Sequence, residues 1–142
     1  MPYSSTNGKR FVQSCVDLIK HKRRAHNVLD LGAGSGTYSD LFRKQLAGSW
    51  TAVEIWEPYI NQFNLAEKYD SIIISDARNF FLMADVRCYD VIFIGDMLEH
   101  LPKHEAKELI KLAKQFLTQS GIILASVPIG EYPQDEYMGN PY

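Results

Sequence analysis

The chain has 142 residues, of which 46% are hydrophobic and 23% charged, and its formal net charge at pH 7 is −2. This length predicts one domain whose core needs neither disulfides nor a structural metal. The composition is that of a globular protein and excludes a disordered or collagen-like chain. The small net charge disfavours nucleic acid as a partner without excluding it, because a local basic run such as Lys20–His26 remains.

Cysteine usage and the N-terminal segment bear on location. Cys15 and Cys88 lie far apart, inside apolar segments, as expected of small core side chains in a reducing compartment. The N-terminal residues MPYSSTNGKR lack the basic start and apolar stretch of a signal peptide, and no apolar run approaches the roughly 20 residues of a membrane helix. We therefore predict a cytoplasmic protein with no membrane partner.

Helical and strand patterns alternate from the first residues onward. Apolar residues recur at helical spacing over Lys9–Lys20, a short apolar run follows at Asn27–Leu31, and helical spacing returns from Tyr38 to Leu46. Further strands are predicted at Trp50–Ile55, Ser71–Ser75, Tyr89–Ile94 and Gly121–Val127, and further helices at Pro58–Lys68, Asn79–Ala84 and from Pro102 through Leu117, with Gly121 just past the end of the last.

The strand runs indicate the fold class. SIIIS, DVIFI and IILAS are continuously apolar, as required of strands covered by helices on both faces. We predict an α/β fold: a doubly wound, mostly parallel Rossmann-like sheet, forming a single domain over residues 1–142 with 129–142 as a loop or tail. In such a sheet a ligand binds outside the carboxyl ends of the strands, where the strand order reverses.

The segment VLDLGAGSGT, Val28–Thr37, joins the first predicted strand to a helix. Alternating glycines permit a sharp turn and let a ligand approach the backbone, although such turns also join strands to helices with no ligand. The dinucleotide fingerprint G-x-G-x-x-G would need glycine where this chain has Thr37. The match is instead to D-x-G-x-G-x-G.

That form, placed on the first strand, resembles the class I S-adenosylmethionine-dependent methyltransferases, over about Phe11 to Pro128. The resemblance implies S-adenosyl-L-methionine (SAM) as the cofactor and methyl transfer as the activity. It implies that Asp30 holds the ammonium group of the cofactor. The residues that pack against the cofactor would be Gly32, Ala33, Gly34 and Gly36. Taken alone, Asp30 is also typical of a turn residue that caps local N–H groups.

Acidic residues also end the next two strands. The resemblance places Glu54 against the ribose hydroxyls, with Ile55 and Trp56 beside the adenine ring, although a solvated strand end and a surface-packed Trp56 are the alternatives. It places Asp76 and Ala77 at the adenine amino group. Asp76 stands before a short predicted helix, so it is equally suited to cap that helix, and the two roles are compatible.

The segment GDMLEHLP after the fourth predicted strand resembles the part of the family that lies beside the transferable methyl group. Gly95 would contact the cofactor, Asp96 would orient an acceptor and His100 would act as a base; packing of a helix entry is the alternative for His100. Asp96, Glu99 and His100 are also spaced as in relatives that bind Mg²⁺ through E-x-x-E-H, but Asp replaces the first Glu, and we predict no metal.

Family members usually continue with a C-terminal helix and β-hairpin, which this sequence lacks, so the chain is expected to be an excerpt or to cover its sheet edge as a homo-oligomer. The short acceptor-side segments favour a small-molecule substrate. Tyr132 and Tyr137 would contact it or, equally, lie on the loop surface. The alternative function is a catalytically inactive SAM-binding partner subunit, or another nucleotide-binding module.

Overall fold

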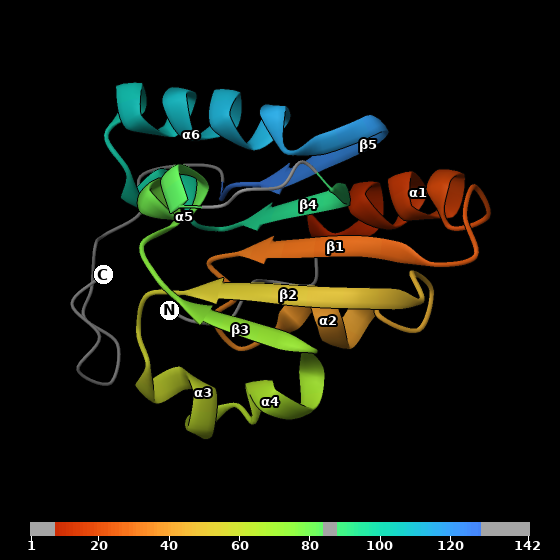
Figure 1. Cartoon of the computed structure of the whole chain (residues 1–142), viewed down its shortest axis with the longest axis horizontal. Coiled ribbons are helices and arrows are strands. Elements are labelled where there is room, and N and C mark those ends of the chain that lie inside the picture. The colour runs from red at the N-terminus through yellow and green to blue at the C-terminus, as the bar shows by residue number, and fades with distance from the viewer. Residues whose placement is uncertain (1–7, 84–87, 129–142) are drawn as a thin grey trace.

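The computed structural model describes residues 8–83 and 88–128 of the chain. Five strands form one sheet in the order β3-β2-β1-β4-β5, and every neighbouring pair is parallel (Figure 1). The strands are β1 (His26–Leu31), β2 (Gly48–Glu54), β3 (Ser71–Ile74), β4 (Tyr89–Gly95) and β5 (Leu117–Ser126). The helices are α1 (Arg10–Ile19), α2 (Thr37–Phe42), α3 (Pro58–Gln62), α4 (Leu65–Lys68), α5 (Ala77–Met83), the 3-10 helix η2 (Leu98–His100) and α6 (Lys103–Gln115).

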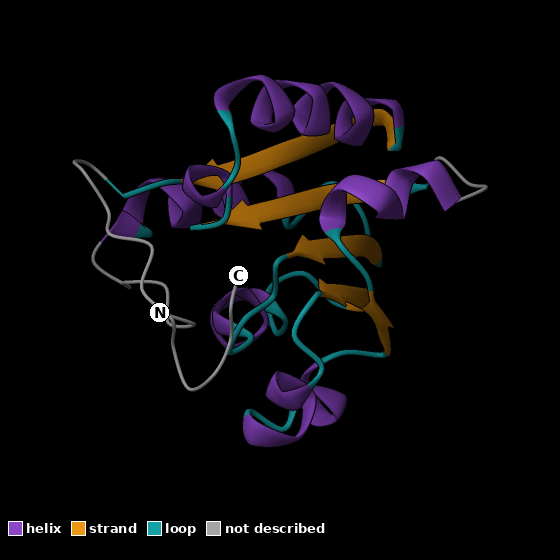
Figure 2. Ribbon diagram, turned by 90° about the vertical axis from the view of Figure 1, so that its left-hand side faces the viewer, coloured by secondary structure: helices purple, strands orange, loops and turns teal. Residues whose placement is uncertain are grey.

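The sheet is buried on both faces, because successive side chains of a strand point to opposite sides. In β1, Val28 contributes to the core shared with α1, α2, α3 and α4, whereas Leu29 and Leu31 contribute to a second core shared with α5 and α6. Figure 2 shows the strands as one sheet with helices on either side. The predicted doubly wound α/β fold is confirmed.

The order of the strands reverses between β1 and β4. From β1 the chain adds β2 and then β3 on one side, and it returns to place β4 and β5 on the other. The arrowheads in Figure 1 all point to one edge of the sheet, so the segments that follow the strands gather there. The glycine turn after β1 and the Asp96–His100 segment after β4 are therefore neighbours at the switch point.

Two element predictions are wrong. The helix predicted over Pro58–Lys68 is two helices, α3 and α4, because Asn64 between them adopts a left-handed backbone conformation with φ 51° that no α-helix accommodates. The last helix ends at Gln115, and Leu117 is the first residue of β5. Gly121 therefore lies inside that strand, at a register shift between β4 and β5, rather than past the end of a helix.

The remaining differences are at element ends. α5 begins at Ala77, two residues before the predicted start, directly after Asp76. The predicted tail 129–142, with Tyr132 and Tyr137, lies outside the described residues. Within the part of the chain that the structure describes, none of the helices has the length and apolar character required to cross a bilayer.

Candidate cofactor and acceptor site

The turn after β1 depends on its glycines. Gly32, Gly34 and Gly36 have φ values of 68°, 52° and 80°, a region in which side chains with a Cβ atom are strained. The N–H groups of Gly32 and Ala33 donate to the Val53 carbonyl oxygen at 2.9 and 3.2 Å, which ties the turn to the end of β2. A Cβ atom on Gly32 would lie 2.9 Å from the Met97 side chain, so the turn also touches the segment after β4.

Asp30 stands at the base of this turn and is 1% exposed. Its Oδ2 accepts a hydrogen bond from the Tyr69 hydroxyl at 2.6 Å, while its Oδ1 is buried and has no hydrogen-bond partner among residues 8–83 and 88–128. Burial raises the pKa of Asp30 to about 7, against the lowering effect of the Tyr69 hydrogen bond. Within the described ranges its carboxylate caps no local N–H group, and one buried oxygen is left for a donor.

Glu54, the last residue of β2, is 4% exposed, so the alternative of a solvated strand end is wrong. Its Oε2 accepts from the Gly34 N–H at 2.8 Å and its Oε1 from the Trp56 N–H at 2.8 Å. Burial raises the pKa of this carboxyl, and the backbone hydrogen bonds oppose that rise. Glu54 thus joins the turn after β1 to the segment after β2, and each of its oxygens keeps a second lone pair for another donor.

Asp76 follows β3 and caps α5. Its Oδ1 accepts from the Arg78 N–H at 2.8 Å, and its carboxylate forms an ion pair with the Arg78 guanidinium that lowers the Asp76 pKa. Arg78 also donates to Glu105 of α6 at 2.5 Å. The capping alternative is therefore what the structure contains, while the adenine role of Asp76 and Ala77 stays a prediction. Ile55 and Trp56 are partly buried, and Trp56 packs against the core beneath α1–α4.

A group of four polar side chains surrounds the end of β4; we call Lys9, Tyr38, Asp96 and Ser126 the Lys9 cluster. The Lys9 Nζ is 2.6 Å from Ser126 Oγ, 3.0 Å from the Tyr38 hydroxyl and 3.4 Å from Asp96 Oδ2. Lys9 is only 5% exposed, and the Asp96 side chain is 27% exposed. The cluster holds the Asp96 carboxylate at the surface of the site.

Two backbone features bring this cluster together. A Cβ atom on Gly95 would lie 2.0 Å from Cε2 of Tyr38, so glycine is the residue that lets the tyrosine ring reach the cluster. Asp96 has φ 48°, a left-handed conformation uncommon for a residue with a Cβ atom, and its N–H donates to the Ser126 carbonyl at 2.8 Å. Local strain of this kind is typical of functional sites.

His100 and Glu99 lie beside the cluster on η2 and are partly exposed. Burial lowers the pKa of His100 and raises that of Glu99, whose buried Oε2 lacks a hydrogen-bond partner among the described side chains and backbone. Leu98 and Leu101 pack against the core beneath α5 and α6. Over residues 8–83 and 88–128 the structure has no group of three or more His, Cys, Asp or Glu side chains placed to hold a metal ion.

Comparison with known proteins identifies the family. A family model described as "Methyltransferase domain" matches residues 7–142, which is nearly the whole chain. The chain belongs to the methyltransferase-domain family. This confirms the methyltransferase family predicted from VLDLGAGSGT, Val28–Thr37. A search of curated proteins finds no match.

Solved structures share the fold of this methyltransferase domain. A protein from Pyrococcus horikoshii is 22% identical with a TM-score of 0.63, covering 88% of this chain and 62% of its own. A SAM-dependent methyltransferase from Archaeoglobus fulgidus is 24% identical, with a TM-score of 0.62 and coverages of 82% and 51%. The plantazolicin methyltransferase BpumL, in complex with SAH, is 23% identical, with a TM-score of 0.61 and coverages of 85% and 53%. The chain thus spans between 51% and 62% of these structures' lengths.

Sequence reasoning does not identify Lys9, Tyr38, Tyr69 or Ser126 as part of the site of this methyltransferase domain. Lys9 and Tyr38 lie in helical patterns, where they read as ordinary helix residues, and Tyr69 precedes a strand. Their contacts join residues 29 to 117 positions apart. No local motif or periodicity marks these four residues, because their hydrogen bonds form only when the distant segments come together in the fold.

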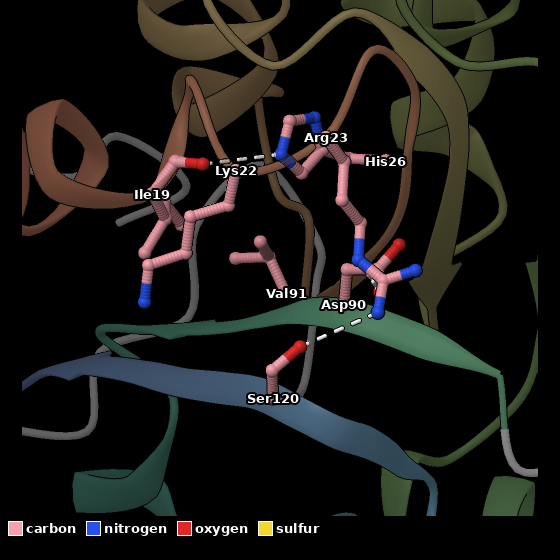
Figure 3. A pocket seen from close by; sticks show the side chains of 7 residues that line it. All are labelled: Ile19, Lys22, Arg23, His26, Asp90, Val91 and Ser120. Atoms are coloured by element: carbon pink, nitrogen blue, oxygen red, sulfur yellow. Dashed lines mark hydrogen bonds and ion pairs between the residues drawn. The ribbon is translucent and has the colours of Figure 1, made fainter.

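The methyltransferase domain also has a small pocket at the opposite edge of the sheet, at the amino ends of β1 and β4 (Figure 3). Arg23 forms an ion pair with Asp90 at 3.1 Å there and donates to Ser120 at 3.3 Å. Part of the basic run Lys20–His26 is thus paired with the sheet. The lining residues are Ile19, Lys22, Arg23, His26, Asp90, Val91 and Ser120. None of them is a predicted site residue.

Proposed function

We propose that the chain binds SAM at the carboxyl ends of β1, β2 and β4 and transfers its methyl group to a small-molecule acceptor. The observation that carries the proposal is Asp30: a buried carboxylate with an unpartnered oxygen, at the base of a turn built on three left-handed glycines. An unpartnered buried acceptor costs about 1–3 kcal/mol, and a cationic donor from a ligand would recover it.

The residues present fit the amino-acid and ribose parts of this cofactor. Asp30 Oδ1 would accept from the ammonium group, and the free lone pairs of Glu54 would accept from the ribose hydroxyls. The cofactor would pack against the backbone of Gly32, Ala33, Gly34, Gly36 and Gly95. At Gly32, Gly36 and Gly95 the space that a Cβ atom would take is filled by the side chains of Met97, Lys68 and Tyr38. The contacts with the cofactor bring the turn after β1 and the end of β2 onto one ligand.

The adenine end would lie beyond β2 and β3. Ile55 and Trp56 would contact the ring, and the Asp76 carboxylate, already fixed by Arg78, would accept from the adenine amino group together with the Ala77 backbone. The lowered pKa of Asp76 supports this role, since the carboxylate stays ionised and acts only as an acceptor.

On the acceptor side, Asp96 and His100 would do the chemistry that the protein must supply. Bound SAM provides a methyl group already activated by the sulfonium, so the protein's residues align the acceptor and take its proton. Because burial lowers its pKa, His100 is neutral near pH 7 and able to accept a proton. Asp96, held by Lys9 and Ser126, would orient the acceptor.

Titration calorimetry with SAM, S-adenosylhomocysteine (SAH) and NAD tests the proposal. We expect both sulfur compounds to bind and NAD to bind at least tenfold more weakly, since Thr37 replaces the last glycine of the dinucleotide fingerprint. The proposal would be contradicted if neither SAM nor SAH bound. The cytoplasmic location, a homo-oligomer and the disfavoured nucleic-acid partner remain predictions from the sequence.

A further inference from the structure

Tyr69 lies beside the edge strand β3, and its side chain extends to Asp30 on the central strand β1. It follows α4 and precedes β3, its side chain is 5% exposed, and its hydroxyl donates to Asp30 Oδ2 of the central strand β1 at 2.6 Å. Its ring packs against Trp50 with centroids 6.3 Å apart. The contact spans two strand positions of the sheet, from the edge to the middle.

The backbone next to Tyr69 is anchored by α2 and by the residues just before and after that helix. The carbonyl of Lys68 accepts from Ser39 Oγ at 2.7 Å and from the Arg43 guanidinium at 2.8 Å, and the Lys68 ammonium donates to the Ser35 carbonyl at 2.8 Å. The Tyr69 N–H donates to the Leu65 carbonyl at 3.0 Å. With the backbone tied and the ring packed, the hydroxyl has a fixed position.

The Tyr69 hydrogen bond makes the two oxygens of Asp30 unequal. A phenol has one proton to donate, and it goes to Oδ2, so the carboxylate is fixed with Oδ1 as its unsatisfied oxygen. Burial raises the Tyr69 pKa well above its usual value, so the hydroxyl remains a donor throughout the physiological range.

We propose that Tyr69 is a positioning residue for cofactor binding, whose hydroxyl holds Asp30 so that Oδ1 receives the ammonium group of the cofactor. This inference rests on the proposed function. Tyr69 makes no contact with the cofactor in this arrangement; it acts through Asp30.

The charged and titratable groups that face Asp30 determine the pH at which its carboxyl ionises. The Tyr69 hydrogen bond and the charge of Lys9 favour the ionised carboxylate, whereas Glu54 disfavours it; Tyr38 also lies close enough for its own pKa to rise because of Asp30. Removal of the Tyr69 hydroxyl raises the Asp30 pKa. An ammonium ligand binds the ionised form, so its affinity is lost as pH falls through that pKa, and Tyr69→Phe moves this loss to higher pH.

The test compares two ligands and two tyrosines by calorimetry between about pH 5.5 and pH 8.5. SAH carries the ammonium group, whereas 5′-methylthioadenosine has the same nucleoside without the amino-acid part. We expect Tyr69→Phe to weaken SAH about tenfold near pH 7 and to raise the midpoint of its pH dependence by about one unit, since a hydrogen bond to a charged group is lost. Methylthioadenosine affinity stays unchanged. The matched control is Tyr89→Phe, which removes a hydroxyl bonded to Thr51 at the opposite edge of the sheet and leaves both ligands unaffected.

Asp30→Asn supplies a second arm, because it removes the carboxyl through which Tyr69 acts, and methylthioadenosine binding reports whether each variant is folded. In that background Tyr69→Phe should cause no further change in the pH dependence of SAH binding, because the titrating group is gone. An unchanged SAH profile in Tyr69→Phe, or an equal loss for SAH and methylthioadenosine, would overturn the inference and leave the proposed function standing. A wild-type chain that binds neither ligand would overturn both.

Discussion

At the scale of single residues, the buried carboxylate of Asp30 serves ligand binding but lowers the stability of the unliganded protein. Its pKa is raised from 3.8 in the unfolded reference to about 7 by burial, so the folded state holds its proton more tightly than the unfolded state. Stability is therefore fully present below about pH 4 and falls as pH rises through this window, to a constant lower level above about pH 7. The unpartnered Oδ1 lowers the free energy of unfolding further.

We expect Asp30→Asn to stabilise the unliganded protein while it weakens SAH binding. Asparagine keeps an acceptor for the Tyr69 hydroxyl and carries no charge, so the free energy of unfolding should rise by about 1–4 kcal/mol near pH 8, with a smaller gain near pH 5. Chemical denaturation at the two pH values measures this. The control is Asp70→Asn, which should lower stability, because the Trp50 N–H and then Arg43 hold the Asp70 pKa below its usual value. A gain that does not depend on pH would contradict the account of Asp30.

Gly95 is the second residue whose role can be measured, because the Tyr38 ring fills the space that a side chain there would need. Gly95→Ala places a Cβ atom against the Tyr38 ring, so we expect the free energy of unfolding to fall by about 1–3 kcal/mol and the Lys9 cluster to be displaced. Gly8→Ala is the control, because nothing lies within 4 Å of the added atom. Equal thermal stability of the two variants would show that the Tyr38 ring does not need the space over Gly95.

The residues that sequence predicts and those that it misses differ in the range of their contacts. Asp30, the glycines and Glu54 are recognisable because a local motif and the end of a strand fix their positions. The partners that orient them are not local: Tyr69 lies 39 residues from Asp30, and Lys9 lies 87 residues from Asp96. Only the folded sheet brings these pairs into contact.

At the scale of elements, periodicity predicts the existence and type of helices and strands better than their ends. The α6 pattern includes Leu117 because it continues the apolar spacing, yet pairing of Leu117 with Tyr89 of β4 takes that residue into the sheet. The break between α3 and α4 rests on the left-handed Asn64, whose residue type tolerates this conformation but does not demand it. Tertiary pairing and a single backbone conformation decide both boundaries.

Variants of Asp76, the residue before α5, test whether it only caps that helix or also contacts the ligand. Asp76→Ala removes the cap, and we expect the free energy of unfolding to fall by about 1 kcal/mol, whereas Asp76→Ser should recover much of this because serine also caps helices. Thermal denaturation measures the capping effect. Calorimetry with SAH then measures the other role: if Ser restores both stability and affinity, the adenine contact is not needed, and if it restores stability alone, Asp76 also serves the ligand.

At the scale of the whole molecule, the strand order decides where the site lies. Continuously apolar strands alternating with helices predict the doubly wound parallel sheet, and the order β3-β2-β1-β4-β5 places the turns after β1 and β4 side by side. The pattern of elements does not contain the strand order itself, which only the folded sheet shows. The sequence also carried no signal that each oxygen of Glu54 accepts from a backbone N–H group, one from Gly34 and one from Trp56.

A ligand that joins these segments stabilises the entire domain. We expect SAH at about 100 times its Kd to raise the free energy of unfolding by about 2.7 kcal/mol, because it binds only the folded state. A thermal-shift series over SAH concentration measures this, with NAD as the control nucleotide. A shift of equal size with NAD would favour a general nucleotide-binding module over a methyltransferase.

The most direct test of the central claim is the structure of the chain with SAH bound. We predict that the ligand lies across the carboxyl ends of β1, β2 and β4, with its ammonium group within hydrogen-bond distance of Asp30 Oδ1 and its ribose hydroxyls at Glu54. SAH bound elsewhere, for example in the pocket lined by Arg23 and Asp90 at the amino ends of the strands, with Asp30 Oδ1 still unpartnered, would contradict it.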